Sequence, residues 1–458
     1  MTGGTIGTVL VANRGEIAVR VVRTCREMGI RTVVAHSSAD RESAAVRLAD
    51  EAIQIGPGPA SESYLNIPAI IEAARARGAD AIHPGYGFLS ENADFAEVCE
   101  EEGVIFIGAP AKVMTQLGDK SRARALMTAA GLPLLPGSRD PLDADAAAAL
   151  AEEIGYPVIV KAVAGGGGRG MRVVRSGVEF PRAWAQTRAT AQAVFGDGRL
   201  YLERYLESAR HVEIQVLADT HGDVVHLGAR DCSLQRRHQK LLEESPAPRL
   251  PEATLREMGE AAVRGALAAG YVGAGTFEFL LDGQGRFYFM EVNCRLQVEH
   301  PVTEMVTGLD LVREQVRIAA GEPLGYRQDE VLPRGAAIEC RINAEDPARD
   351  FAPAAGLLER CSLPGGPFTR VDTHAFPGYR VPALYDSLLA KLIVWAPDRD
   401  GAIARMRRAL AEIELTGPGV ATTTGFLYDV LDHPRFRTAQ HDTTFIESLS
   451  WRDDTPRR

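Results

Sequence analysis

Residues 275–300 read Gly-Thr-Phe-Glu-Phe-Leu-Leu-Asp-Gly-Gln-Gly-Arg-Phe-Tyr-Phe-Met-Glu-Val-Asn-Cys-Arg-Leu-Gln-Val-Glu-His. Within this stretch, Asp282–Gly285 is a turn signal between two runs rich in aromatic and β-branched residues. Such a pattern predicts an antiparallel β-hairpin. If Leu281 pairs with Arg286, acidic residues from both strands fall on the same face.

Glu278 and Glu291 are these two acidic residues. In this register Glu278 lies opposite Phe289, and Glu291 lies on the diagonal. Diagonal neighbours are about 7–8 Å apart at Cα. We therefore expect the two carboxylates to be close enough to hold one cation between them.

The alternation with period two continues beyond the hairpin. If the chain stays extended, Glu291, Asn293, Arg295, Gln297 and Glu299 share one face. The intervening residues then point to the opposite face: Val292, Cys294, Leu296 and Val298.

The polar row has the chemistry of a metal and anion site. Carboxylate and amide oxygens suit Mg²⁺ or Mn²⁺ rather than zinc, and Mg²⁺ in so sparse a site usually bridges phosphate oxygens. Arg295 can bind a small anion in a bidentate manner. The alternative is a solvated strand face, but few residues of this row favour an exposed strand. We therefore favour the functional interpretation.

A glycine-rich loop spans residues 165–170, Gly-Gly-Gly-Gly-Arg-Gly. It satisfies GxGxxG, but the dinucleotide fingerprint opens a helix, whereas Met171–Val174 reads as a strand. We expect the tip of a β-hairpin whose backbone N–H groups approach phosphates, with Lys161 adding a charge. A flexible turn without a ligand is the alternative. No GxxxxGK[ST] sequence occurs, so a nucleotide would have to be held in another way.

Residues 230–240 form a basic cluster, Arg-Asp-Cys-Ser-Leu-Gln-Arg-Arg-His-Gln-Lys. A solvated charged loop and an anion site are both compatible with it. In an acidic chain that also carries signals for phosphate binding, the anion site is at least as well supported.

The organisation of the chain points to several domains. Strand and helix patterns alternate over residues 8–110, which predicts βαβ units on a parallel sheet. The loop 83–87 (His-Pro-Gly-Tyr-Gly) follows a strand, where such sheets place ligand loops, although a structural turn is also possible. A linker is expected at 131–137, and strands dominate from residue 211 onward.

Composition excludes several classes of protein. The chain has 458 residues, a net charge of −10 and 45% hydrophobic residues, as in a folded globular protein. The acidic balance argues against binding to nucleic acid or an anionic membrane. No run of about 18 apolar residues and no signal peptide is present, so we expect a cytoplasmic protein. The cysteines are scattered and predict reduced thiols: Cys25, Cys99, Cys232, Cys294, Cys340 and Cys361.

Taken together, the motifs resemble the biotin carboxylase subunit of biotin-dependent acyl-CoA carboxylases, in the ATP-grasp superfamily. The resemblance spans nearly the whole chain, and an ordered set of this length is more specific than any one motif. Its segments are 11–18, 83–92, 118–120, 161–170, 210–215, 230–240, 291–303, 339–345 and 385–387.

The resemblance implies a fold and a reaction. The fold would combine α/β and α+β parts: an N-terminal Rossmann-like parallel sheet (1–118), an ATP-grasp domain (119–335) with a mobile lid at about 132–206, and a β-rich C-terminal domain (336–450). The reaction would be that of an ATP-dependent carbon–nitrogen ligase, which carboxylates biotin with bicarbonate through carboxyphosphate. ATP, two Mg²⁺ or Mn²⁺ ions, and biotin as a substrate are implied with it.

The resemblance also assigns roles to individual residues. Nucleotide contacts would come from Lys120, Lys161, Gly167, Gly168, His211, His238 and the hinge Glu203-Arg204-Tyr205-Leu206. Metal ligands would be Glu278, Glu291 and Asn293, and the bicarbonate site would be Lys240, Arg295, Gln297 and Val298. Glu299 would deprotonate bicarbonate, and Arg341 would lie near the ureido oxygen of biotin.

Four positions depart from the pattern of the family. They are Ala164, Cys294, the segment 353–356 (Pro-Ala-Ala-Gly) and Thr423. None is a proposed ligand, so the expected activity stands. Two alternatives stay open: another ATP-grasp ligase, which would form carbamoyl phosphate or couple an amine, and a non-catalytic nucleotide-binding module.

The expected partners follow from the same resemblance. The chain contains no Met-Lys-Met biotinylation tripeptide. We therefore expect the biotin carboxyl carrier protein and the carboxyltransferase to be separate chains. The resemblance also implies that the chain forms a homodimer. The final acceptor, acetyl-CoA or another acyl-CoA, is not encoded here.

Overall fold

The computed structural model describes residues 5–138, 140–164 and 170–449. Its N-terminal part is a parallel five-stranded sheet in the order β3-β2-β1-β4-β5, as the alternation of strands and helices predicts. The strands are β1 (Thr8–Val11), β2 (Arg31–Ser37), β3 (Glu51–Gly56), β4 (Ala81–His83) and β5 (Ile105–Phe106). The helices of this part are α1 (Gly15–Glu27), α2 (Ala44–Leu48), α3 (Ile67–Ala76), α4 (Ala93–Glu101) and α5 (Ala111–Gly118).

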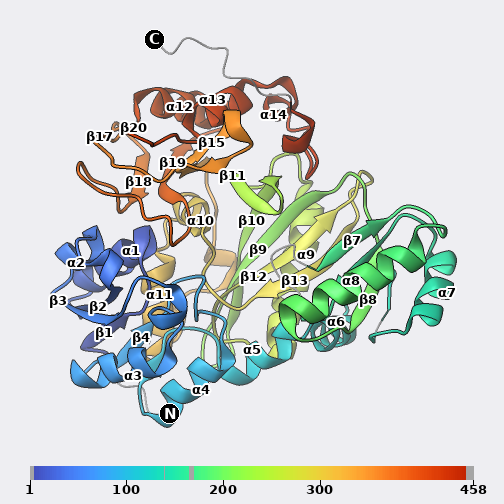
Figure 1. The fold of residues 1–458 in the computed structure, drawn as a ribbon, viewed down its shortest axis with the longest axis horizontal. Coiled ribbons are helices and arrows are strands. Elements are labelled where there is room, and N and C mark those ends of the chain that lie inside the picture. Colours follow the sequence, from blue (N-terminus) through green and yellow to red (C-terminus); the bar gives the residue numbers. More distant parts are fainter. Residues whose placement is uncertain (1–4, 139, 165–169, 450–458) are drawn as a thin grey trace.

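A small lobe follows, which we define as helices α7 (Ala144–Ile154) and α8 (Phe180–Phe195) with strands β6 (Val158–Ala162), β7 (Met171–Val174) and β8 (Leu200–Arg204). The strands form an antiparallel sheet in the order β7-β6-β8. Both helices pack on this sheet through a core of their own, which includes Phe180 and Trp184. Strands β6 and β7 pair as the predicted hairpin, whose tip lies outside the described residues. In Figure 1 the lobe stands apart from the N- and C-terminal parts of the chain.

The centre of the molecule is an antiparallel eight-stranded sheet in the order β13-β12-β9-β10-β11-β14-β19-β18. Its strands β11 and β14 pair directly, so one sheet continues across the predicted boundary between residues 335 and 336. The strands are β9 (Arg210–Ala218), β10 (Val224–Arg236), β11 (Gln239–Ser245), β12 (Gly273–Leu281), β13 (Phe287–Asn293), β14 (Ala336–Asn343), β18 (Thr369–Thr373) and β19 (Leu388–Ala396).

Helices cover both ends of this sheet. Helices α6 (Lys120–Ala129) and α9 (Glu252–Ala269) pack on β9 and β12, and α12 (Arg399–Glu412) and α13 (Thr424–Asp432) pack on β14 and β19. The other helices and short strands are α10 (His300–Thr307), α11 (Leu311–Ala319), α14 (Pro434–Arg437), β15 (Glu345–Asp346), β16 (Ala352–Pro353), β17 (Arg360–Ser362) and β20 (Glu414–Thr416). Among the described residues, none of the helices has the length and apolar character needed to cross a bilayer.

The register of the β12–β13 hairpin differs from the predicted one. Leu281 pairs with Phe287 rather than Arg286, because the Asp282 carboxylate accepts the N–H groups of Gln284 and Arg286 and so extends the turn. The prediction was therefore wrong by one residue.

A β-bulge then changes the pairing again between Phe279 and Glu278. It places Glu278 directly opposite Glu291 instead of on the diagonal. Side chains directly opposite in an antiparallel pair are closer than diagonal ones and share a face. The bulge thus brings the two residues closer together on the hairpin than the predicted diagonal register would.

Candidate functional site

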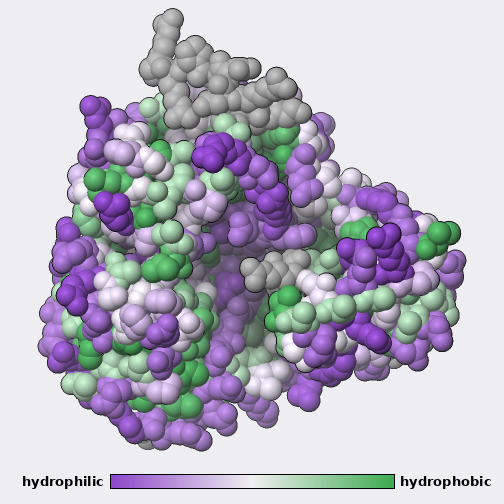
Figure 2. Space-filling model, in the orientation of Figure 1, coloured by the Kyte–Doolittle hydropathy of each residue, from purple (hydrophilic) through white to green (hydrophobic). Residues whose placement is uncertain are grey.

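A deep cleft of about 1070 Å³ opens between the lobe, the eight-stranded sheet and the N- and C-terminal parts. Figure 2 shows a hydrophilic hollow at this place. Most of the residues predicted for the site line it: Lys120, Lys161, Glu203, Arg204, Tyr205, Leu206, His211, His238, Lys240, Glu278, Glu291, Asn293, Arg295, Gln297, Val298 and Arg341. Gly167 and Gly168 lie outside the described residues.

The hairpin carboxylates form one wall of the cleft. Glu278 is almost fully buried, whereas the Glu291 side chain is 40% exposed and lies 4.0 Å from the Lys120 ammonium. The Asn293 amide donates to Glu278 Oε1 at 2.9 Å. The three oxygen-bearing side chains are therefore neighbours, as the sequence predicted.

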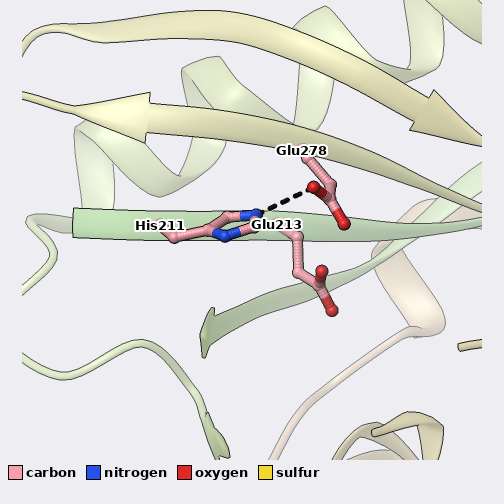
Figure 3. Close-up of side chains that lie close together, drawn as sticks. All are labelled: His211, Glu213 and Glu278. Carbon is pink, nitrogen blue, oxygen red and sulfur yellow. Dashed lines mark ion pairs between the residues drawn. The ribbon is translucent and has the colours of Figure 1, made fainter. Parts of the chain in front are cut away.

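Strand β9 places two more groups next to Glu278, of which only His211 lines the cleft. Figure 3 shows His211 pointing at Glu278, with 3.0 Å between Nε2 and Oε2, and Glu213 beside them. Burial disfavours the His211 cation, but Glu278 outweighs it and raises the pKa of His211.

The donor set fits Mg²⁺ or Mn²⁺ on the side of Glu291. Glu213 does not line the cleft, and its oxygens are paired with Arg230 at 2.5 Å and Lys240 at 2.7 Å. Glu278 is also paired, with His211 and Lys240, but it lines the cleft beside Glu291. Glu291 has a more open environment and faces the cleft. Glu278, Glu291 and Asn293 thus form an all-oxygen set suited to a hard divalent ion.

Lys240 lies at the centre of the carboxylate cluster. Its ammonium contacts Glu213 Oε2 at 2.7 Å, Glu278 Oε1 at 3.1 Å and Glu299 Oε1 at 2.6 Å. Burial disfavours the charge, but these anions outweigh it and raise the pKa of Lys240 well above its ordinary value. Lys240 is therefore a permanent cation at the floor of the cleft.

Glu299 lies just behind the surface of the cleft and is fully buried. Arg341 Nη2 donates to Glu299 Oε2 at 2.9 Å, and Arg341 Nε donates to Glu243 Oε1 at 2.7 Å. Although burial favours the neutral acid, Lys240 and Arg341 hold the pKa of Glu299 well below its ordinary value. The carboxylate is thus ionised and covered by the two cations.

Arg295 completes this end of the site. Its guanidinium donates to Glu91 Oε2 and Gln297 Oε1, each at 2.8 Å, and to Asn293 Oδ1 at 3.2 Å. The chain is not a strand here, because β13 ends at Asn293 and a turn follows. The polar side chains converge all the same.

The apolar residues of this segment follow the prediction in part. Val292, Cys294 and Leu296 are buried in hydrophobic cores. Alternation predicted that Val292 and Val298 point away from the polar row, but both also line the cleft. For Val298, the turn that replaces the strand explains the difference.

The opposite end of the cleft lies between the lobe and helix α6. Glu203, at the end of β8, pairs with both Lys161 and Arg124. Burial disfavours the Lys161 cation, but Glu203 outweighs it and raises the pKa of Lys161. His238 stands in the β10–β11 turn with φ +65° and is exposed to the cleft.

Comparison with known proteins places the chain in a family. The biotin carboxylase N-terminal domain family matches residues 5–114, the carbamoyl-phosphate synthase L chain ATP binding domain family matches 119–327, and the biotin carboxylase C-terminal domain family matches 339–448. A biotin carboxylase of Nostoc sp. is 53% identical over 443 residues, which are 96% of this chain and 99% of that protein. The chain belongs to the biotin carboxylase family.

Two solved structures support the membership. The biotin carboxylase–βγ-ATP complex of Campylobacter jejuni has a TM-score of 0.95 and 47% identity, and the match covers 97% of this chain and 99% of that one. The biotin carboxylase domain dimer of Hydrogenobacter thermophilus 2-oxoglutarate carboxylase, with MgADP, ADP and bicarbonate, has a TM-score of 0.93 and 48% identity, over 97% and 98% of the chains. The ATP-grasp fold of the family, with its mixed α/β architecture, is confirmed.

Sequence reasoning gave no role to several residues that build the site. Glu91 orients Arg295, Glu213 balances Lys240, and Arg124 shares Glu203 with Lys161. Glu91 and Glu213 stand inside motifs quoted above, at 83–92 and 210–215. Their charge within those motifs was the available signal, but their partners are more than 25 residues away.

Proposed function

We propose that the chain carboxylates biotin with bicarbonate while ATP is converted to ADP and phosphate, and that the predicted residues have the roles given above. The main support is the cluster in which Lys240 and Arg341 share the Glu299 carboxylate, beside the Glu278–Glu291 pair. It unites a base, two cations and a metal-type oxygen set.

Glu299 is the proposed base. An incoming bicarbonate anion competes with Glu299 for Lys240 and Arg341, and it also meets Arg295 and Gln297. As the cations turn to the substrate, Glu299 loses its stabilisation and becomes a stronger base. Removal of the bicarbonate proton makes the oxygen a better nucleophile toward the γ-phosphate.

Lys120 and Lys161 are the proposed phosphate contacts, with Glu203 to Leu206 along the adenine. Positive groups at this end offset charge on the transferring phosphoryl group, where positioning and electrostatics do most of the work. Glu278, Glu291 and Asn293 would hold Mg²⁺ or Mn²⁺, which would supply further charge stabilisation when bound. The lobe closes over the nucleotide in this proposal and excludes water.

Arg341 is the proposed contact to biotin. Loss of the N–H proton from biotin puts negative charge on the ureido oxygen, and a fixed guanidinium stabilises such an anion. Arg341 is itself held in place by Glu243 at 2.7 Å. The group is thus preorganised for this role.

We also propose the three domains 1–118, 119–335 and 336–450, with residues 132–206 as the lid. The three family matches support these divisions. The pairing of β11 with β14 supports a shared sheet between the second and third domains, against which only the lid would move.

The function is tested by measuring ATP hydrolysis with and without bicarbonate, biotin and ammonia. The proposal expects hydrolysis that depends on bicarbonate and rises with free biotin. Dependence on ammonia or an amine would support the other ATP-grasp reactions, and nucleotide binding without turnover would support the non-catalytic module.

For the partners, we propose a homodimer that works with a separate biotin carrier protein and a separate carboxyltransferase. The family membership supports this arrangement, and one similar structure is described as a dimer. Light scattering tests the dimer, and a pull-down from native extract tests the partner chains and their acceptor. Biotin attached to a lysine of this chain would contradict the separate carrier.

A further inference from the structure

Lys391 is a buried cation at the point where three parts of the molecule meet. It lies on β19, and none of its surface is exposed. In the sheet it stands opposite Arg341 of β14 on one side and opposite Asp372 of β18 on the other. Lys391 therefore lies next to the reaction centre, although it does not line the cleft.

The ammonium of Lys391 joins the N-terminal part to the segment that carries the base. It donates to the backbone carbonyl of Val298 at 2.9 Å and lies 3.2 Å from Glu16 Oε1. Glu16 is in the first turn of α1 and also accepts the hydroxyl of Tyr86, which lines the cleft. One buried cation thus contacts two distant segments, at Glu16 and Val298, and is linked to a third through the bond from Tyr86 to Glu16.

The hydrogen bond from Lys391 to Val298 fixes the backbone just before Glu299 and so affects the direction of the Glu299 side chain. In the turn that precedes α10, the carbonyl of Gln297 accepts from His300 Nδ1 at 2.8 Å. The next carbonyl, of Val298, is the one that Lys391 holds. Because the peptide is planar, fixing this carbonyl fixes the plane that joins Val298 to Glu299.

Stability alone does not explain a cation at this place. A buried ion pair is often no more stabilising than apolar residues of similar volume. A buried lysine that donates a hydrogen bond to the backbone next to a catalytic carboxylate is better explained by the orientation of that carboxylate. A carboxylate held by fixed neighbours is placed for proton transfer before the substrate arrives.

We propose that Lys391, oriented by Glu16, is a positioning residue for the bicarbonate site, which sets the Val298–Glu299 peptide and thereby aims Glu299 at the substrate. This inference rests on the function proposed above. It assigns no contact between Lys391 and any substrate.

The test compares Lys391→Met with the wild-type chain in bicarbonate-dependent ATP hydrolysis. Loss of a hydrogen bond from a charged donor predicts a rise of about tenfold to a hundredfold in the KM for bicarbonate. The affinity for ADP with Mg²⁺, measured without bicarbonate, should be unchanged. The variant Glu16→Gln keeps the shape of its side chain and should raise the same KM by a smaller factor.

Asp372→Asn is the matched control. Asp372 is buried on the neighbouring strand opposite Lys391, but it pairs with Arg370 at 2.7 Å and does not contact the base segment. It should leave the KM for bicarbonate unchanged. A purely structural role for Lys391 predicts that both variants lose thermal stability and that neither changes this KM.

Combination with Glu299→Gln sharpens the test. If Lys391 acts through Glu299, Lys391→Met should have little further effect in the Glu299→Gln background, because the two changes affect one interaction. Independent, multiplying effects would contradict the proposal, as would an unchanged KM for bicarbonate in both Lys391→Met and Glu16→Gln. Should Lys391→Met not fold, Glu16→Gln decides. Lack of bicarbonate-dependent turnover in the wild-type chain would instead refute the proposed function.

Discussion

The eight-stranded sheet and the lobe hold the two ends of the cleft in different ways. On the side of the sheet, Lys240, Glu299 and Arg341 each have two or more charged partners within 3.1 Å, and all three are buried or nearly so. The lobe has a small core of its own and the buried pair Lys161–Glu203, and the pair Arg175–Glu207 at its edge is exposed. The proposed reacting groups are thus fixed on one continuous sheet or directly beside it, whereas Lys161 and Glu203, at the proposed nucleotide end, belong to the lobe.

The largest expected effect comes from the sheet side. Glu299→Gln removes the proposed base while it keeps the size of the side chain, so kcat should fall by roughly 10² to 10⁴. The KM for ATP should change little, because the nucleotide contacts are elsewhere. Steady-state ATP hydrolysis at saturating bicarbonate measures both.

Glu207 is exposed at the edge of the lobe, and Glu207→Gln is the control for that experiment, which should behave as the wild-type chain. A wild-type kcat in Glu299→Gln would show that Glu299 is not the base. It would also contradict the difference between the sheet side and the lobe.

Next in size is the effect of breaking a buried pair on the sheet. Arg210 Nη2 contacts Asp231 Oδ2 at 2.6 Å, and Arg210 outweighs the burial of Asp231 and lowers its pKa. Asp231→Asn should therefore cost about 3 kcal/mol of unfolding free energy at neutral pH. Urea unfolding of both proteins measures it.

The pH dependence of that difference has a definite sign. A folded-state pKa below the unfolded value of 3.8 gives stability that is fully present above pH 3.8 and is lost as the pH falls. The difference in unfolding free energy between wild type and Asp231→Asn should be constant from about pH 7 to pH 5 and should decrease toward pH 3. A difference in unfolding free energy that increases at acidic pH would contradict the ion pair between Arg210 and Asp231.

Lys161→Met tests the lobe side. Loss of its charge should raise the KM for ATP about tenfold to a hundredfold, because bonds from charged donors are worth about 1.5–3 kcal/mol. The KM for bicarbonate should stay near the wild-type value. If the bicarbonate KM rises as much as the ATP KM, the two ends of the cleft are not separate in function.

The smallest effect is expected at the surface of the lobe. Arg175→Ala breaks the exposed pair with Glu207 and should change the unfolding free energy by less than about 1 kcal/mol. Thermal unfolding of the variant beside Asp231→Asn gives the direct contrast. A loss as large as that of Asp231→Asn would show that the lobe is held as tightly as the sheet.

Local patterns in the sequence were enough to predict the hairpin and its acidic residues. They could not give the register, because the Asp282 side chain draws Arg286 into the turn and a bulge follows. Neither the extended turn nor the bulge can be recognised from the alternation of polar and apolar residues. The pair Glu278–Glu291 was found, but its direct opposition was not.

Residues 230–240 show a second limit. Their charge allowed a solvated loop, yet most of them belong to strands β10 and β11, and Arg230 is fully buried. Its partners Glu213, Gln215, Thr276 and Thr303 come from three other segments. The burial of Arg230 is made possible by these tertiary contacts, which a local sequence pattern does not contain.

The most direct test of the whole account follows the oxygen atoms. ATP is hydrolysed with ¹⁸O-labelled bicarbonate and biotin, on a timescale shorter than exchange of the label with water, and the inorganic phosphate is analysed by mass spectrometry. If deprotonated bicarbonate attacks the γ-phosphate beside Glu299, Lys240 and Arg341, the phosphate carries one ¹⁸O atom from bicarbonate. Phosphate whose new oxygen comes only from water would contradict the account.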